Sequence, residues 1–396
     1  MLLMGDVMAE LHSHNFEIYF GEQLNLCGTA LAHILKIKTH LWVSSCPIMD
    51  HMAHILKLPT PLSYVPSLSF VSMSDKPSYL ERVNNIVDSW FNTLLFRYAS
   101  ELTNNLYRKH YGSANLTSQR LKLTFSIDFP DVDDIARESP LIFPFKSELK
   151  KGRDGVIYFS FGTNVKSNYL PREFVQNLFA AFAKFPNYRV IFKHETDDEV
   201  NSRRYFHSNT NVFLTKWAPQ ADLLSSPEVK VFITHGGYNS LLETAIRAVP
   251  VIAFSFFGDQ NRNARIAERN GWGIPLNKRQ LLDSPQPLID ALQEVLTNST
   301  YKESALRTQK LVLTKPFAAS DRLVKYTEFV AANDGRLPEL QPKGRHLSYV
   351  ELYNFDIFVP LTVVLVGLLW TIITVLCCAV VKICSITISV QKRKVA

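Results

Sequence analysis

Apolar runs alternate with amphipathic segments along the middle of the chain. The continuous apolar runs, which are typical of strands buried on both faces of a parallel sheet, lie at 156–161, 188–193, 211–217, 229–234 and 249–255. Helical spacing predicts helices between them at 171–185, 239–247 and 260–270. This alternation predicts a doubly wound parallel sheet, and ligands of such sheets bind outside the carboxyl ends of the strands.

The first part of the chain has a weaker pattern of the same kind. Its predicted strands are 16–20 and 39–44, and its predicted helices are 28–35 and 84–111. These elements are typical of half of a further α/β domain. The acidic stretch 128–144, which prolines flank, is predicted to connect the two domains.

The chain carries one long uncharged segment near its carboxyl end. Between Asp356 and Lys382 no side chain is charged, and as a helix the segment would span roughly 37 Å, against a hydrocarbon core of about 30 Å. We therefore expect a transmembrane helix over 357–381; a buried core helix is the alternative. All charged residues of the tail 382–396 are basic. This favours a tail in the cytosol, with the rest of the chain on the lumenal side of the membrane. Sequons at Asn115 and Asn298 are compatible with that side.

Composition excludes several classes of protein. With 46% hydrophobic and 20% charged residues, the chain is neither disordered nor collagen-like. Four basic residues of the tail account for more than half of the net charge of +7, so no nucleic-acid partner is expected. Cys27 and Cys46 could form one disulfide, but two buried free thiols are the favoured interpretation. No cysteine and histidine spacing indicates a metal site.

Polar and glycine residues gather in three nearby segments. They are WAPQADLL at 217–224, THGGYNSLLETA at 234–245 and FGDQNRNA at 257–264. Together they resemble the donor-binding signature of UDP-glycosyltransferases, a membrane-anchored family that includes glucuronosyltransferases. The resemblance runs from about Phe16 to the carboxyl end. It implies a GT-B-type two-domain α/β architecture with a complete C-terminal Rossmann-like domain, an incomplete N-terminal domain and one transmembrane helix.

The segment His235-Gly236-Gly237 follows a predicted strand and precedes a predicted helix. Glycines there let backbone N–H groups approach an anion at an electropositive helix N-terminus, so a diphosphate fits, with His235, Gly237, Asn239 and Ser240 around it. The spacing of Ser240 and Glu243 also fits a capping box, which needs no ligand. The resemblance instead implies that Glu243 binds ribose hydroxyls.

The other donor-site candidates also have two interpretations. Trp217 offers a flat face for uracil, or is an ordinary core tryptophan. The resemblance implies that Gln220 binds the base or ribose. Asp259 and Gln260 suit sugar hydroxyls, or cap the next helix. The resemblance also implies that Ser160, Gly162 and Thr163 form a loop that faces the phosphates.

For catalysis, the resemblance implies an inverting transfer in which a histidine base deprotonates the acceptor and an acidic residue orients that histidine. Glu22 matches the acidic residue. The family's base lies upstream of it, and His12 and His14 do not match its motif, so we expect both to be surface residues. Because a signal peptide is also missing, we expect that the natural chain begins before Met1.

These observations lead to a first functional hypothesis. The chain transfers glucuronic acid or glucose from a UDP-sugar, its co-substrate, to a hydroxyl or acid group of a small lipophilic acceptor, in the endoplasmic reticulum membrane and without a metal or further cofactor. The alternative is an inactive, membrane-anchored UDP-binding protein that pairs with full-length relatives as an oligomer. The predicted divisions are 1–128 for the partial acceptor domain, 129–150 for the linker, 151–340 for the donor domain, and 341–356, 357–381 and 382–396 for the juxtamembrane segment, transmembrane helix and tail.

Overall fold

The computed structural model describes most of the chain. The described residues are 5–22, 27–44, 46–68, 73, 76–112, 144–195, 211–335, 337–340, 344 and 347–395. The chain divides into two units, Met1–Glu339 and Leu340–Ala396, and each is described by itself.

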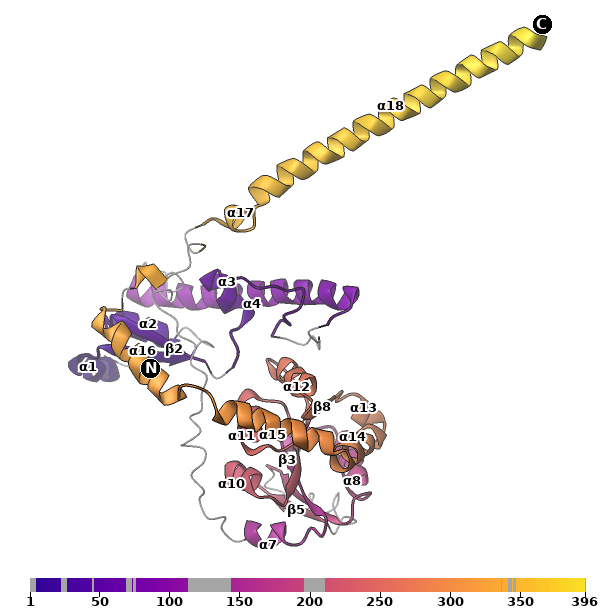
Figure 1. Cartoon of the computed structure of the whole chain (residues 1–396). Helices are drawn as coiled ribbons and strands as arrows, with labels where there is room; N and C mark the ends of the chain where they lie inside the picture. Colours follow the sequence, from indigo (N-terminus) through magenta and orange to yellow (C-terminus); the bar gives the residue numbers. More distant parts are fainter. Residues whose placement is uncertain are drawn as a thin grey trace. The chain divides into compact units, whose positions relative to one another are not determined.

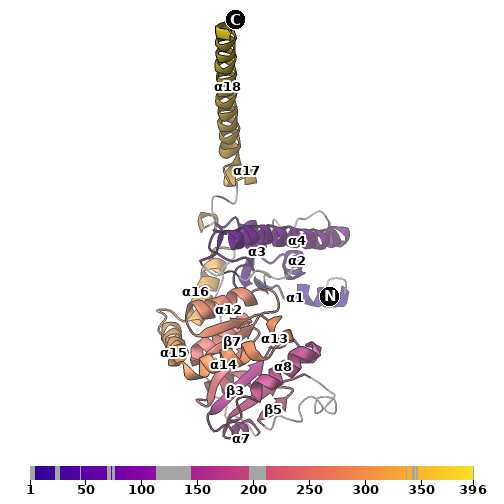
Figure 2. The same ribbon diagram turned by 90° about the vertical axis from the view of Figure 1, so that its right-hand side faces the viewer.

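A six-stranded parallel sheet forms the centre of the packed part of the larger unit that follows Phe145 (Figures 1 and 2). Its order is β5-β4-β3-β6-β7-β8, so the chain starts in the middle, moves to one edge, and returns to build the other half. The strands are β3 (Gly155–Ser160), β4 (Tyr188–Lys193), β5 (Val212–Thr215), β6 (Val229–Thr234), β7 (Val251–Phe254) and β8 (Gly273–Leu276). The predicted doubly wound parallel sheet is confirmed.

Side chains of the central strand explain why helices cover both faces. Every residue of β3 is buried. Alternate residues point to opposite faces, so Ile157 and Phe159 join one hydrophobic core, and Val156 and Tyr158 join the other. The Phe159 ring stacks on that of Phe192 with the ring centroids 4.1 Å apart. Burial of such a side chain contributes roughly 1.5–3 kcal/mol to folding.

Two layers of helices enclose this sheet (Figure 2). The first layer, which packs on the Phe159 side, contains α8 (Arg172–Phe182), α13 (Gln280–Asp283) and α14 (Gln286–Thr297). The second layer contains α10 (Gln220–Ser225), α11 (Tyr238–Arg247), α12 (Gln260–Arg269) and α15 (Ser299–Leu313). In α8 the predicted apolar face, with Phe174, Leu178 and Phe182, is the buried one.

The end of the predicted linker belongs to this packed unit. Residues 113–143, which include Asn115 and most of that linker, lie outside the described residues. From Phe145 to Leu149 the chain forms α7, whose Leu149 joins the second hydrophobic core. The buried Glu148 pairs with Arg189 at 2.6 Å. Packing of Leu149 and pairing of Glu148 therefore extend the core of the sheet domain into the predicted linker 129–150.

The first part of the chain contains a small parallel sheet of β1 and β2. Its elements are α1 (Gly5–Ser13), β1 (Ile18–Glu22), α2 (Cys27–Ile34), β2 (Thr39–Val43), α3 (Asp50–Leu56) and α4 (Tyr79–Tyr111). Helix α16 (Ala319–Ala332), from the predicted donor domain, packs here, because its Val330 shares a core with Leu41 and Leu337 (Figure 1). The sequence pattern does not reveal this return of the chain.

Exposure corrects one expectation about cysteines. Cys27 and Cys46 are both free thiols, so no disulfide joins them. Cys27 is exposed and Cys46 is half-buried, so the expectation that both are buried is wrong. His12 and His14 are exposed, as expected. The side chain of Asn298, in the second sequon, accepts a hydrogen bond from the backbone N–H of Thr300 at the start of α15.

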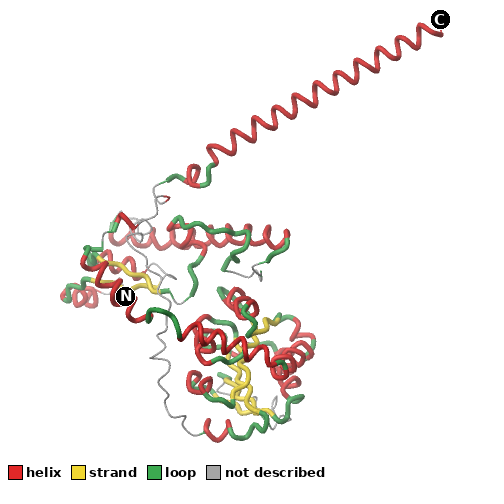
Figure 3. The backbone as a smooth tube through the Cα atoms, in the orientation of Figure 1, coloured by secondary structure: helices red, strands yellow, loops and turns green. Residues whose placement is uncertain are grey.

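The smaller unit contains the short helix α17 (Tyr349–Leu352) and the long helix α18 (Phe355–Val395), drawn in Figure 3 as a continuous helical tube. Between Phe355 and Lys382 this helix is long and apolar enough to cross a membrane, with a mean hydropathy of 2.7 and none of it buried. The alternative of a buried core helix is therefore wrong. The helix continues through the predicted basic tail as far as Val395.

Candidate functional site

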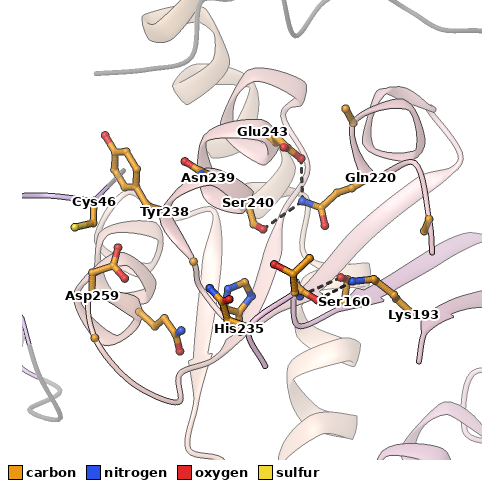
Figure 4. A pocket seen from close by; sticks show the side chains of 18 of the residues that line it. Cys46, Ser160, Lys193, Gln220, His235, Tyr238, Asn239, Ser240, Glu243 and Asp259 are labelled. Atoms are coloured by element: carbon orange, nitrogen blue, oxygen red, sulfur yellow. Dashed lines mark hydrogen bonds between the residues drawn. The ribbon is translucent and has the colours of Figure 1, made fainter. Parts of the chain in front are cut away.

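The candidate site is a cavity of about 640 Å³ at the carboxyl ends of the strands, beside β3 and β6, where the strand order reverses. Every predicted donor-site residue lines it, in the segments that follow these strands and β5 and β7 (Figure 4). These residues are Ser160, Gly162, Thr163, Trp217, Gln220, His235, Gly237, Asn239, Ser240, Glu243, Asp259 and Gln260. The expectation that Trp217, His235, Glu243 and Gln260 surround one hollow is confirmed; their binding roles stay predictions.

The turn between β6 and α11 is built on glycines. Gly236 has φ +81°, in the left-handed region that favours glycine, and a Cβ there would lie 3.1 Å from the carbonyl oxygen of Gln260. Gly237 is the N-cap of α11, and no side chain caps the helix. The proposed capping box of Ser240 and Glu243 is wrong, because the helix begins at Tyr238 and Ser240 lies within its first turn. The first N–H groups of a helix lack intrahelical acceptors, so this end suits an anion.

His235 is held as a neutral imidazole between two glycines. A Cβ at Gly162 would lie 2.8 Å from the imidazole Cε1 atom, and one at Gly237 would lie only 2.3 Å from Nε2. Burial, with a smaller contribution from the charge of Lys193, lowers the pKa of His235 to about 4. Its Nδ1 atom is buried without a hydrogen-bond partner in the described part of the chain. A neutral imidazole retains one N–H with which it can donate to an oxyanion.

Gln220 connects helices α10 and α11 through its side-chain amide. The Nε2 atom donates to the Glu243 carboxylate at 2.8 Å and to the Ser240 hydroxyl at 3.2 Å (Figure 4). The Tyr158 hydroxyl donates to its Oε1 atom at 3.4 Å. The expectation that Gln220 binds the base or ribose stays a prediction; in the structure its amide donates to the carboxylate of Glu243.

Trp217 is a surface residue of the cavity. Strand β5 ends at Thr215, two residues before it, and the Thr215 hydroxyl donates to its carbonyl oxygen at 2.7 Å. Its side chain is 68% exposed, so the alternative of an ordinary core tryptophan is wrong. One face of a tryptophan that the protein does not cover can stack on a flat ring.

Lys193 is a cavity residue that the sequence analysis did not single out. It is the last residue of β4 and only 5% exposed, and its ammonium lies 5.1 Å from the centroid of the Trp217 ring. The ammonium donates to the Gly162 carbonyl oxygen at 2.7 Å and pairs with Glu195 at 2.8 Å. The sequence contained a signal for Lys193, because it ends a strand that was predicted to be buried on both faces. A lysine is rarely buried in such a position without a partner or a ligand.

The last segment of the site joins β7 to α12. Asp259 stands at the N-cap of α12 without capping it, and accepts instead from the Asn263 side chain at 2.7 Å. Burial raises the pKa of Asp259. The Gln260 Oε1 atom accepts from the backbone N–H groups of Phe256 and Phe257, so only its amide NH₂ remains to donate to a ligand. The alternative of a capping pair is wrong.

The loop after β3 faces the histidine turn, since Gly162 approaches the His235 ring. Gly162 has φ +76°, and its N–H donates to the Ser160 hydroxyl at 3.2 Å. Glu22 ends β1, half-buried, and does not line this cavity. Within the described residues, no group of three or more His, Cys, Asp or Glu side chains is placed to hold a metal ion.

The comparisons with known proteins agree with this arrangement. Residues 1–394 match the family model described as UDP-glucoronosyl and UDP-glucosyl transferase. A Caenorhabditis briggsae protein named "Putative UDP-glucuronosyltransferase ugt-47" is 34% identical over 92% of this chain and 71% of its own length. Human UDP-glucuronosyltransferase 1A10 is 28% identical over 93% of this chain and 70% of its own length.

Solved structures show the same fold. The spinosyn forosaminyltransferase SpnP matches with a TM-score of 0.56 and 15% identity, over 83% of this chain and 79% of its own. The glycotransferase of kitacinnamycin matches with a TM-score of 0.51 and 16% identity, over 77% and 74%. The GT-B-type α/β architecture is thereby confirmed. The chain belongs to the UDP-glucuronosyl and UDP-glucosyl transferase family.

Proposed function

We propose that this glycosyltransferase-family chain binds UDP-glucuronic acid or UDP-glucose in the described cavity and transfers the sugar to a hydroxyl or acid group of a small lipophilic acceptor. One observation carries the proposal. A neutral His235, an uncapped helix N-terminus, an oriented Glu243 and an exposed Trp217 line a single cavity. His235 and the helix N-terminus suit a diphosphate, Glu243 suits the ribose hydroxyls, and Trp217 suits a flat base.

In the proposed reaction the acceptor oxygen attacks the anomeric carbon of the sugar. The bond from that carbon to the β-phosphate oxygen breaks, and UDP leaves with the electron pair. The histidine base, which the family resemblance places upstream of Glu22, would take the acceptor proton, and the configuration would invert from α to β. His235, the first N–H groups of α11 and the ammonium of Lys193 stabilise the charge that develops on the phosphate, because preorganised donors lower the barrier of such a step.

Asp259 and Gln260 would bind hydroxyls of the transferred sugar, one as acceptor and one as donor. Ser160 and Thr163 would face the phosphates from the β3 loop. The acceptor would bind to residues 1–128, and Glu22 would orient the catalytic base. Because Glu22 lies outside the cavity lining, its role is proposed on the family resemblance alone.

The proposal includes a membrane anchor. The apolar helix between Phe355 and Lys382 would cross the endoplasmic reticulum membrane once, with the catalytic part in the lumen and the basic tail in the cytosol. The exposure of every described side chain in this segment supports the anchor, because an apolar helix of that length is stable in lipid and costly in water.

The test is transfer from radiolabelled UDP-glucuronic acid and UDP-glucose to a panel of phenols, alcohols and acids, with the full chain in vesicles. We expect a β-glycoside, whose configuration is read by the coupling of the anomeric proton. UDP binding without product under all conditions would favour the alternative, an inactive partner of full-length relatives. Absence of UDP binding would contradict both.

A further inference from the structure

The β3 loop, residues 161–171 between β3 and α8, contributes an exposed tip to the donor cavity. Thr163 and Asn164, at this tip, line the cavity and are exposed. The residues on either side of the tip are held more firmly. Gly162 is half-buried, and Ser167, which begins the short 3₁₀ helix η1 (Ser167–Tyr169), is only 2% exposed. A loop binds a ligand with precision only where such neighbouring contacts hold its backbone.

Both ends of the tip are attached to the end of β4. The ammonium of Lys193, the last residue of β4, donates to the carbonyl oxygen of Gly162 at 2.7 Å (Figure 4 shows Lys193 beside the start of the loop). At the other end, the backbone N–H and the hydroxyl of Ser167 both donate to Oε2 of Glu195, each at 3.1 Å. The other carboxylate oxygen, Oε1, pairs with the Lys193 ammonium at 2.8 Å. One carboxylate therefore joins the two attachments, because each of its oxygens serves one of them.

Burial makes these attachments firm. Lys193 is only 5% exposed, so removal of the carboxylate would leave a buried ammonium without its counter-ion, which is costly. The hydroxyl of Ser167 also lies 2.8 Å from Nδ1 of His194, and this contact further fixes the hydroxyl. Gly162 and Glu195 engage two of the three N–H groups of the Lys193 ammonium. Within the described part of the chain, the third remains for a ligand.

We propose that Glu195 is a positioning residue for the sugar donor. It does not line the cavity; it holds the Lys193 ammonium and the β3 loop in the arrangement that receives the diphosphate. The inference rests on the proposed function, in which this cavity binds a UDP-sugar. It adds a residue that the donor never touches and that acts through Lys193 and Ser167.

The sign of the effect distinguishes positioning from simple electrostatics. A carboxylate near a diphosphate repels it, so electrostatics alone predicts that removal of the Glu195 charge tightens UDP binding. Positioning predicts the opposite. Without the carboxylate, the ammonium of Lys193 and the β3 loop lose their fixed arrangement, and the ligand must order them at a cost in affinity.

The experiment measures the affinities of the solubilised full chain for UDP, by calorimetry, and for uridine, by its displacement of UDP. Uridine lacks the phosphates, so the ratio of the two affinities reports the phosphate contacts. In Glu195→Gln the single carbonyl oxygen cannot replace both carboxylate oxygens. We expect this variant to bind UDP about fivefold more weakly or less tightly still, and uridine as the parent does. Glu173→Gln, the same substitution at an exposed position on α8 outside the cavity lining, should change neither affinity.

A second variant covers the case in which Glu195→Gln disturbs the fold and loses uridine as well. Ser167→Ala removes the hydroxyl but retains the backbone N–H that donates to Glu195, so its ratio of UDP to uridine affinity should fall by a smaller factor. A ratio that is unchanged or raised in Glu195→Gln overturns the inference; if that variant loses uridine, an unchanged ratio in Ser167→Ala does so. A parent chain that binds neither UDP nor uridine overturns the proposed function itself.

Discussion

The side-chain amide of Gln220 donates a hydrogen bond to the Glu243 carboxylate at 2.8 Å, which joins the first turn of α10 to α11 across the cavity. A second hydrogen bond, to Ser240, fixes the amide itself. An ionised carboxylate that is held in one orientation can accept hydrogen bonds from a ribose without first losing rotational freedom. This relationship makes the role of Glu243 testable.

Glu243→Ala should weaken UDP binding by about tenfold or more, because hydrogen bonds to a charged group are worth roughly 1.5–3 kcal/mol. The sharper readout is the ratio of affinities for UDP and 2′-deoxy-UDP. In the parent we expect UDP to bind several-fold more tightly, and in Glu243→Ala the two ligands should bind almost equally. Gln220→Ala should reduce the ratio in the same direction. If neither variant changes the ratio, Glu243 does not bind the 2′-hydroxyl of the ribose.

Gly162→Ala should weaken UDP binding as well as folding. The substitution forces alanine to adopt φ +76° and places a Cβ against the His235 ring. Gly112→Ala is the control for backbone strain, because Gly112 also has a positive φ, +97°, and among the described residues no atom lies within 4 Å of an added Cβ. Backbone strain of about 1–3 kcal/mol should lower the thermal midpoint of both variants. Only Gly162→Ala should also lower UDP affinity, measured by calorimetry.

Lys193→Met should raise the pKa of His235 above its value of about 4, because the charge of Lys193 is one of the two causes of the lowered pKa. Burial, the larger cause, remains, so the pKa should stay below 6.5. Lys193→Arg retains the charge and should leave the pKa low. NMR titration of the histidine ring carbons measures the pKa in all three proteins. A pKa that is unchanged in Lys193→Met would show that Lys193 does not act on His235.

Acidification should destabilise the chain through His235. Its pKa is about 4 in the folded state and 6.5 when unperturbed, so the unfolded state binds more protons between these values. The resulting stability is fully present above pH 6.5 and is lost as the pH falls toward 4; the loss at pH 5 is about 2 kcal/mol. Urea unfolding of the solubilised chain at pH 7 and pH 5 measures it. His235→Asn should show a smaller difference between the two pH values, and an equal difference would contradict the neutral buried imidazole.

Much of the sheet domain could be predicted because its strands are unusually apolar. The run 156–161 is buried throughout, and the helix after Pro171 buries the predicted phenylalanine face. The position of α16 could not be predicted, since Val330 packs against Leu41, almost 300 residues away in the sequence, and no local pattern encodes that contact. The start of α4 was predicted five residues late, although Ser78 and Glu81 form a capping box there.

The position of the candidate site could be predicted from its motif, but the hydrogen bonds within the site could not. Ser240 and Glu243 have the spacing of a capping box, yet the helix begins earlier because Gly237 is the N-cap. Gln220 and Glu243 come from different helices, so their pairing depends on the tertiary fold. Lys193 was overlooked because it belongs to a strand rather than to the motif, and the structure shows that it is almost fully buried beside the cavity.

The most direct test of the account is calorimetric titration of UDP into the solubilised full chain and its His235→Ala variant, with His14→Ala as the control for the same substitution at an exposed position. If the cavity between the β3 loop and the start of α11 binds the diphosphate, His235→Ala should bind UDP at least several-fold more weakly than the parent, and His14→Ala should bind it as the parent does. Equal affinity of the parent and His235→Ala for UDP would contradict the assignment of this cavity.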